Sequence, residues 1–593
     1  MGLFDSMKAW EATGKVGDGP ADVKAASSAH KVDYSAALVL RYVTNVPSFA
    51  PPPIDAGIPD AQGPTPHPDP WSVGQRQWQN YLDQFQTKVS AWRRPNPQVD
   101  WANDFAGSWK GQVKELGNTL IDAAEAKKRI RPIGGAHAAG DVCKPDADGQ
   151  LLQVDDFHQV LDAPYLPATA DKSTLAWIGG GVRIVELNKR LAARGQAMLN
   201  MGGYNGQTAA GALCTGTHGS GYNIGALYSV IQSIWIVVIA ADGKPELRIV
   251  EPSKGFSDPA AFAADVVKPG EVRRVHITDD VTFQAVCQGV GWVGAVYAMT
   301  IRTARNYWLK QTKEMKTWSA AKQTLLADFQ AHRNYELALS PMPCWQEDGT
   351  FDHSCLTIRR DQVPAGTNPR WPTNKFMGNV DNLVKNDPRG ISAAADVIQT
   401  FAGVGGIGAF VHNALAGMQV KDFSSAPPNI LLLPYGNHFR AKSCEIHVRL
   451  SDGIKMLDTL LAAVRKFAHD TPCRVVNSPM GVRVIAPTKG PLSTYDWADG
   501  SHTLSIEVPI LLNAADKGWA GSNAEQLLLD IFASLGAAGI EARLHWGQYH
   551  KIDRAQMLKF YGADRVAAFE KVRSDFDPKG LFGNVASDRL AFK

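Results

Sequence analysis

The sequence predicts an α+β protein with two large domains, the second of which contains an antiparallel sheet. The chain has 593 residues, which is more than one hydrophobic core normally organises. Short strand patterns alternate with helical patterns between residues 101 and 305. Longer strand patterns, with helices between them, follow in residues 306–540. We therefore expect two cores, preceded by an N-terminal extension (1–100) and followed by a C-terminal segment (541–593).

The extension contains a proline-rich stretch, residues 50–70, that predicts an extended linker. In the first domain, one helix is predicted over Ile184–Gly195, because Ile184, Leu187 and Leu191 have helical spacing and Gly195 is a typical helix end. Strands are predicted at Ile130–Ile133, Leu151–Val154, Leu175–Ile178, Ile231–Ala241 and Ala295–Ile301.

In the second domain, strands are predicted at Cys444–Leu450, Val482–Ala486 and Thr503–Leu511. The uncharged stretch Ile398–Val420 is long enough to span a bilayer, but its glycines and polar residues lower its hydrophobicity. We expect it to be buried or to line a pocket.

Composition argues against several classes of protein. With 45% hydrophobic and 20% charged residues and a net charge of +3, the chain is typical of a soluble globular protein and favours neither nucleic acid nor a membrane surface. Seven scattered cysteines form no Cys-x-x-Cys pair, so neither a metal site nor a disulfide framework is expected. A cytoplasmic location is predicted, and no signal peptide is recognisable. An oligomer is possible.

Two glycine-rich stretches are the strongest functional signal. The first, Arg131–His137, follows a predicted strand, and the second runs from Leu213 to Gly221. Glycine allows close approach of the backbone, and the N–H groups of such loops can form a concave site for an anion such as pyrophosphate. A nucleotide cofactor held between the two loops is the first hypothesis.

Together these stretches resemble the vanillyl-alcohol-oxidase superfamily of PCMH-type FAD proteins, in its aldonolactone oxidase and alditol oxidase branch. Gly211–Gly221 is similar to the family's Ala-Thr-Gly-Thr-His-Gly-Ser-Gly signature, and Ile130–Cys143, a strand followed by a Gly-x-x-His loop, is similar to its first flavin loop. His545-Trp546-Gly547 and Asp577–Asn584 follow in the family's order. The resemblance covers residues 100–593.

The resemblance implies a two-part PCMH-type FAD-binding domain, formed by residues 101–305 with the C-terminal segment, and an α+β cap over the flavin. It implies FAD covalently attached through His137, although a loop histidine that only hydrogen-bonds the cofactor is the alternative. Cys214 lies too deep in the second loop for a second attachment. The implied cofactor-binding residues are Pro132, Ile133, Gly134, Gly135, Ala136, His137, Ala138, Ala139, Gly202, Gly203, Thr208, Gly211, Thr215, Gly216, Thr217, Gly219, Ser220, Val296 and His545.

On the substrate side the chain departs from the family. The Glu-x-Arg pair of the relatives keeps its arginine as Arg483, but its carboxylate is Gly481. The lysine after His-Trp-Gly is Gln548, and a substrate-binding serine is Gly203. A site without these partners loses selectivity for a polyol, so a larger or less polar substrate is expected. Gly202 leaves room for oxygen beside the flavin, unless Gly202 and Gly203 only form a turn.

Oxidation of an alcohol also needs a base for the hydroxyl proton. Glu507 could replace the missing carboxylate beside Arg483. Strand alternation places Glu445, His447 and Arg449 on the same face of one strand. That face is either a polar cluster in the site or a solvent-exposed surface. Tyr549 and His550 are further candidates. Arg483, Gln548, Glu507, Glu445 and His447 are thus the predicted catalytic residues.

Three functions remain open. The first is an oxidase that takes hydride from a CH–OH carbon onto flavin N5 and passes electrons to O2, giving hydrogen peroxide. The second is a diverged flavoprotein in which FAD is structural or non-redox. The third is an aldonolactone dehydrogenase that uses another electron acceptor.

Overall fold

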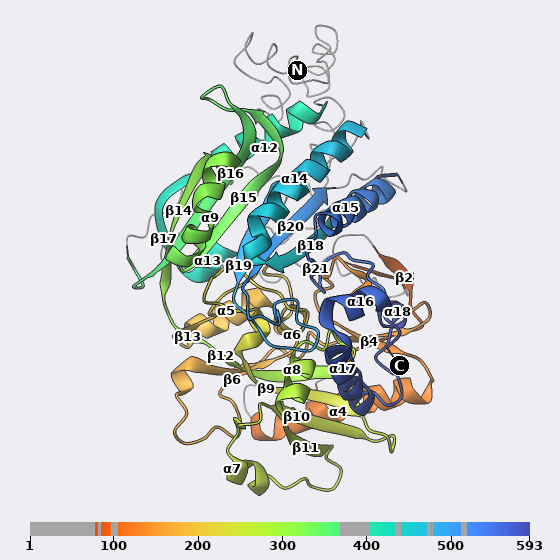
Figure 1. Ribbon diagram of the computed structural model, residues 1–593. Helices are drawn as coiled ribbons and strands as arrows, with labels where there is room; N and C mark the ends of the chain where they lie inside the picture. Colours follow the sequence, from red (N-terminus) through yellow and green to blue (C-terminus); the bar gives the residue numbers. More distant parts are fainter. Residues whose placement is uncertain are drawn as a thin grey trace, which may run out of the picture.

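The computed structural model describes residues 77–80, 85–95, 105–367, 403–432, 441–470, 476, 478–511 and 519–592. The predicted proline-rich linker lies outside these residues. Two bodies are stacked in Figure 1, with a large twisted sheet above and the first half of the chain below. The predicted α+β class, with an antiparallel second sheet, is confirmed.

The lower body contains a six-stranded sheet in the order β11-β10-β9-β12-β7-β6. Apart from the parallel pair β10 and β11, its neighbouring strands are antiparallel. Trp177, Trp235 and Tyr297 are fully buried on this sheet beside helix α4. Its elements are α4 (Phe105–Glu125), β6 (Val160–Leu161), β7 (Leu175–Gly179), α5 (Ile184–Ala193), α6 (Ala209–Cys214), β9 (Ile231–Ile239), β10 (Pro245–Glu251), α7 (Pro259–Ala264), β11 (Arg273–Thr278), α8 (Asp280–Cys287) and β12 (Ala295–Arg302).

A second, smaller sheet holds the first glycine loop. Strand β5 (Gln150–Gln153) pairs in parallel with β4 (Ile130–Ile133) on one side and with β3 (Ala91–Arg93) on the other. Part of the stretch expected to be an N-terminal extension is therefore an edge strand of this sheet. The remaining small pairs are β1 (Gln77–Gln79) with β2 (Gln86–Lys88), and β8 (Gln196–Ala197) with β13 (Ala304–Arg305).

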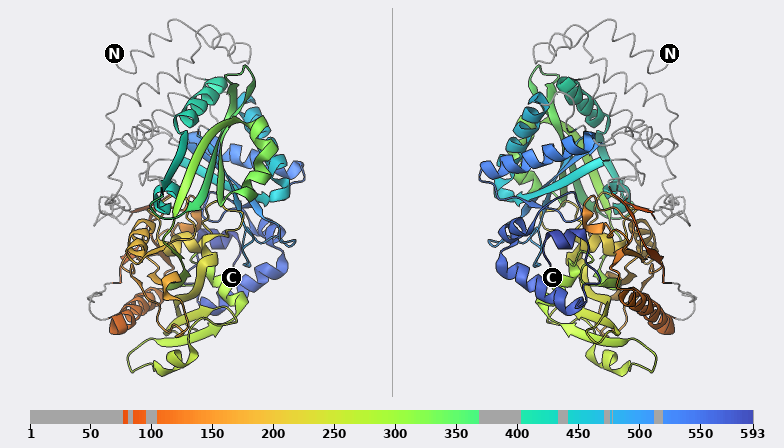
Figure 2. Two further views of the ribbon diagram at one scale, coloured as in Figure 1. Left: turned by 90° about the vertical axis from the view of Figure 1, so that its left-hand side faces the viewer. Right: turned by 90° about the vertical axis from the view of Figure 1, so that its right-hand side faces the viewer.

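The upper body, called the cap here, is an antiparallel sheet in the order β17-β14-β16-β15-β19-β20-β18-β21. Helices α9, α12, α14 and α15 pack against it and close its core (Figure 2). Its strands are β14 (Trp308–Thr317), β15 (Asn334–Trp345), β16 (Phe351–Val363), β17 (Val420–Ser425), β18 (Ala441–Arg449), β19 (Met480–Ile485), β20 (Thr503–Leu511) and β21 (Arg543–Leu544). Its helices are α9 (Trp318–Ala331), α12 (Gly403–Gly417), α13 (Pro427–Leu431), α14 (Gly453–Asp470) and α15 (Trp519–Ala537).

The apolar stretch Ile398–Val420 belongs to the core of the cap. Residues 398–402 lie outside the described residues, and most of the rest is α12, whose Ile407, Val411 and Leu415 are buried against β15 and β16. The alternative that this stretch lines a pocket is wrong for the described part, so it gives no support to an apolar substrate. Among the described residues, no helix combines the length and hydropathy needed to cross a membrane.

The C-terminal segment returns to the lower body through α16 (Arg554–Tyr561), α17 (Ala563–Phe576) and α18 (Val585–Arg589). Phe569 and Phe576 join the core of the first half. Asn584 fixes the end of the segment, because its Nδ2 donates to the carbonyls of Asp141, Val142 and Lys144 at 2.9–3.1 Å. The fold therefore brings residues far apart in sequence to the first glycine loop.

Candidate active site

A cavity of about 220 Å³ lies between the two bodies. Its lower wall is formed by the two glycine loops together with residues 290–296. Its upper wall is formed by β18, β19 and β20 of the cap, and the segment after β21 lies beside both. The site is thus assembled from parts of the chain that are far apart in sequence.

The first loop enters this wall directly from β4, and all of residues 132–139 line the cavity. Close contact with the segment just before the second loop explains its glycines: a Cβ on Gly134 would lie 2.0 Å from the Thr208 hydroxyl, and one on Gly135 would lie 2.6 Å from the Gly206 carbonyl. Ala136 has a positive φ of 51°. Such close packing leaves His137, at the end of the turn, in the cavity wall.

Gly211, Thr215 and Thr217 of the second signature also line the cavity, as do Gly202, Gly203 and Thr208 in the segment before it. Gly202 has a packing reason to be glycine, because a Cβ there would lie 2.7 Å from Cγ2 of Thr217. Val296 and His545, predicted outside the loops, line the cavity as well.

Three predicted cofactor residues do not line this cavity: Gly216, Gly219 and Ser220. Gly216 has a φ of 84° and its carbonyl accepts from the Tyr495 hydroxyl at 2.6 Å. A Cβ on Gly219 would lie 2.4 Å from the Met201 carbonyl. The Ser220 hydroxyl accepts from the Val484 N–H at 3.1 Å, so this end of the signature attaches the loop to the cap.

Strand alternation in the cap separates an apolar face from a charged one. Alternate residues of β18, β19 and β20 enter the cap core, among them Ile446, Val482 and Ile506. Their neighbours Glu445, Arg483 and Glu507 line the cavity. The side chains of Glu445 and Glu507 are 5% and 16% exposed, so the alternative of a solvent-exposed strand face is wrong. Arg449, however, leaves this cluster and pairs with Asp499 and Glu541.

Arg483 is shared among three carboxylates. Its Nε lies 2.7 Å from Oε1 of Glu336, and its Nη1 lies 3.6 Å from Glu507 and 3.8 Å from Glu445. Glu336 also pairs with Arg360. Burial acts to raise the pKa of Glu336, but the two guanidinium groups outweigh it and lower that pKa to about 2.

Glu507 lies directly across from Gly481 in the register of β19 and β20. The carboxylate that is missing at 481 is therefore supplied by the neighbouring strand, beside the same arginine. Oε1 of Glu507 accepts from the Ser443 hydroxyl at 3.2 Å and from Nε2 of Gln548 at 3.1 Å. Burial raises the pKa of Glu507 and nearby Glu445 raises it further, although Arg483 opposes both effects.

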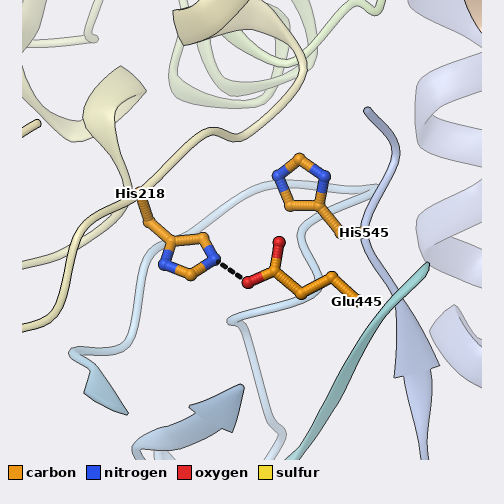
Figure 3. Close-up of side chains that lie close together, drawn as sticks. All are labelled: His218, Glu445 and His545. Atoms are coloured by element: carbon orange, nitrogen blue, oxygen red, sulfur yellow. Dashed lines mark ion pairs between the residues drawn. The ribbon is translucent and has the colours of Figure 1, made fainter. Parts of the chain in front are cut away.

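His218 and Glu445 form a buried ion pair in the cavity wall, drawn with His545 in Figure 3. Nε2 of His218 lies 2.8 Å from Oε1 of Glu445, and these side chains are 2% and 5% exposed. The Ser505 hydroxyl donates to the same carboxylate oxygen. Burial acts to raise the pKa of Glu445, but His218 and other neighbours hold it well below its usual value.

His447, Tyr549 and His550 are outside the cavity lining, which is a correction to their listing as candidate bases. His447 is fully buried with its Nε2 3.8 Å from Glu445, and burial lowers its pKa. Tyr549 and His550 are buried beyond the wall, and burial lowers the pKa of His550 to about 4. None of the three contributes to the wall of the cavity.

The segment after β21 connects the two walls. Its Gly547 carbonyl accepts from the Ala139 N–H at 2.8 Å, and the His545 N–H donates to the Glu445 carbonyl at 3.0 Å. Gln548, in place of the relatives' lysine, lines the cavity.

Cys214 also lies in the wall, and burial raises the pKa of its thiol to about 12, which makes it a poor nucleophile.

The cavity fits FAD in the distribution of its charges. Among the described lining residues, the acidic side chains are Glu445 and Glu507, and both come from the cap. The loop side has closely packed backbone and no carboxylate, which suits a pyrophosphate. The residues present therefore fit the group: the loops would hold its phosphates through backbone N–H groups.

Sequence reasoning missed two members of the site, His218 and Glu336. His218 stands inside the second-loop signature between two predicted cofactor residues, so its position was a usable signal. Glu336 lies on β15, far from any motif, and nothing in its local sequence marks it. Only the register of the cap sheet brings it to Arg483.

Two family models match this chain, and together they cover both walls of the cavity. The model described as FAD binding domain matches residues 111–246, which contain both glycine loops. The model described as D-arabinono-1,4-lactone oxidase matches residues 402–590, which contain β18 to β20 and the C-terminal segment.

Individual relatives are similar at low identity. The chain is 24% identical to D-arabinono-1,4-lactone oxidase of Saccharomyces cerevisiae over 35% of this chain and 33% of that protein. It is 32% identical to alditol oxidase of a Streptomyces species over 26% of this chain and 36% of that protein. The chain thus spans about a third of the length of these relatives. It is 23% identical to L-gulono-1,4-lactone dehydrogenase of Mycobacterium tuberculosis over 80% of this chain and 93% of that protein.

Among solved structures, cholesterol oxidase from B. sterolicum has the same fold, with a TM-score of 0.63 at 13% identity over 91% of this chain and all of that one. The order of the motifs, the cavity built from them and the two family matches agree. The chain belongs to the PCMH-type FAD flavoproteins of the vanillyl-alcohol-oxidase superfamily, in their aldonolactone oxidase and alditol oxidase branch.

Proposed function

We propose that this protein is an FAD-dependent oxidase that removes hydride from a CH–OH carbon and passes the electrons to O2, giving hydrogen peroxide. The observation that carries the proposal is the Glu507–Arg483 pair, which faces the two FAD loops across one cavity. FAD, when bound, supplies the hydride acceptor. The protein must therefore bind the alcohol, orient it and remove its hydroxyl proton.

Glu507 is the proposed base. It lines the cavity, its carboxylate is oriented by Ser443 and Gln548, and its raised pKa is closer to neutral than that of an ordinary glutamate. Arg483 holds the carboxylate in place and can donate to a substrate oxygen. When the hydroxyl proton moves to Glu507, hydride can leave the same carbon toward the cofactor.

The substrate is proposed to be a hydroxyl compound other than a simple polyol. Gly203 and Gly481 offer no side-chain hydrogen bonds, and Ala441 and Pro509 add apolar surface to the cap wall. The remaining polar groups gather at Glu507, where they can bind one reacting hydroxyl. Covalent attachment of FAD through His137 is part of the proposal, because this residue lies in the cavity wall where the resemblance requires it.

Anaerobic mixing with a panel of polyols, aldonolactones and larger apolar alcohols tests this function. We expect at least one alcohol to bleach the flavin absorbance, and air to restore it with one hydrogen peroxide released per flavin. Bleaching that only an artificial acceptor reverses would indicate the dehydrogenase, as in the mycobacterial relative. No bleaching by any alcohol, with intact bound FAD that dithionite reduces, would contradict the proposal and favour a non-redox role.

A further inference from the structure

Three histidine rings surround the single carboxylate of Glu445. His218, His447 and His545 all lie against it, and their ring centroids are 5.5–5.8 Å apart. Four titratable side chains face His218: Glu445 and His447 from β18, Tyr495 from the loop before β20, and His545 from the segment after β21. Arg483 does not face His218 directly, but its Nη1 lies 3.8 Å from Glu445. Hydrogen positions decide which ring carries charge.

For His218 both ring nitrogens act as donors. Nδ1 lies 3.0 Å from the Gly219 carbonyl, which can only accept, so Nδ1 carries a hydrogen. Nε2 faces Glu445 at 2.8 Å. An ionised carboxylate also can only accept, and two further groups favour this form of Glu445: the Ser505 hydroxyl donates to the same oxygen, and Nη1 of Arg483 lies 3.8 Å from it. Nε2 therefore carries a hydrogen too, and the ring is an imidazolium.

The other two rings are neutral. Nδ1 of His545 accepts from the Gly547 N–H at 3.0 Å, which is impossible for an imidazolium. Burial lowers the pKa of His545 to about 3 and also lowers that of His447. The possible metal-ligand atoms of His218, Glu445 and His545 lie within 4.8 Å of one another. Both nitrogens of His218 face protein partners, the Gly219 carbonyl and Glu445, so neither is directed at a metal ion.

We propose that His218 is an imidazolium, paired with Glu445, whose positive charge faces the cofactor cavity and raises the reduction potential of bound FAD. The inference rests on the proposed function only in that FAD must be bound. His218 lines the cavity, and its carbonyl oxygen would lie 3.6 Å from a Cβ on Gly202, the residue that the resemblance assigns to the flavin edge. The same wall contains Gln548, where the resemblance leads us to expect a lysine, so it lacks that positive charge.

The physical effect is electrostatic. With His218 replaced by a neutral side chain, Glu445 is left as a carboxylate without its closest cation, so the wall becomes more negative by one charge. A more negative wall disfavours the electron-rich reduced cofactor. The charge of Arg483 cannot compensate, because Arg483 is already shared with Glu336 and Glu507.

The test measures the midpoint potential of the FAD-bound protein against redox dyes, which needs no substrate. At about pH 8, where Glu445 is ionised, His218→Gln is expected to shift the oxidised-to-reduced equilibrium about tenfold toward the oxidised form, or about 30 mV for a two-electron couple. The double variant His218→Gln/Glu445→Gln removes both charges and should return close to the wild-type potential. His447→Gln, which removes a neutral ring outside the cavity, is the matched control.

An unchanged potential in His218→Gln, or a double variant as low as the single one, would overturn the proposal. If His218→Gln does not retain FAD, Glu445→Gln replaces it in the test. Without the carboxylate the imidazolium of His218 loses its ion pair, so the difference in potential between this variant and wild type should vary with pH, with the variant higher at acid pH. A difference that does not vary with pH would overturn the proposal. Failure of every alcohol to reduce the cofactor would contradict the proposed function but not this inference.

Discussion

Replacing Glu507 by glutamine is expected to slow substrate-dependent reduction of the cofactor by about 10²–10⁴-fold, the usual contribution of a general base. Glutamine preserves the size of the side chain and can still meet Ser443 and Gln548, but it cannot take the hydroxyl proton. Binding of FAD should be unaffected, because Glu507 belongs to the cap wall. Anaerobic stopped-flow reduction of wild type and variant measures the effect.

The pH profile gives a second readout of the same residue. Burial, with Glu445, raises the pKa of Glu507, and only the ionised form can act as a base. The rate of reduction should therefore rise with pH, with a midpoint above the ordinary glutamate value of about 4.3, and Glu507→Gln should lose this rise.

Glu541→Gln is the matched control, since Glu541 is a partly exposed carboxylate that pairs with Arg449 away from the cavity. Its rate should equal that of wild type. If Glu507→Gln kept the wild-type rate and pH profile, the base would have to be another group.

Replacing Arg483 by leucine is expected to destabilise the fold by about 3–5 kcal/mol, the typical cost of breaking a buried ion pair by removing one partner. Arg483 is 18% exposed and serves Glu336, Glu445 and Glu507 together. Removing it leaves Glu336 with Arg360 alone and brings the other two carboxylates together without a nearby guanidinium. Urea unfolding at neutral pH measures the change.

Arg483→Leu should also change how the free energy of unfolding depends on pH in acid. The pKa of Glu336 is about 2 in the folded protein, below its unfolded value, so its contribution is present above about pH 4.5 and is lost as the pH falls toward 2. Arg483→Leu should weaken this loss. Arg359→Leu breaks an exposed pair with Glu314 and should cost only about 0–1 kcal/mol. Equal costs for the two variants would contradict the shared role of Arg483.

Much of the fold could be predicted from local pattern. The strands Ile130–Ile133 and Thr503–Leu511 were predicted with the observed bounds. Helix α5 ends two residues before the predicted Gly195. The glycine loops by themselves indicated only a nucleotide site, and their assignment to FAD came from their resemblance to the family's signatures.

The charged wall could not be predicted in the same way. The sequence shows Gly481 where a carboxylate is expected, but it does not show that Glu507 lies opposite in the neighbouring strand, because register is a property of the whole sheet. For the same reason Glu336, over a hundred residues from Arg483 in sequence, was not predicted. The apolar stretch at α12 was open to a pocket interpretation because apolar cores and apolar pockets have the same composition.

We propose that the cavity between the two glycine loops and the cap binds FAD, with His137 at the ring. Acid precipitation of the flavin-loaded protein, followed by proteolysis and mass analysis of the flavin-bearing peptide, tests this assignment. We expect that the flavin stays with the denatured protein, that the peptide containing His137 carries its mass, and that His137→Ala releases free FAD. Flavin on a different peptide, free FAD released from the wild type by acid, or a folded protein that binds no FAD would each contradict it.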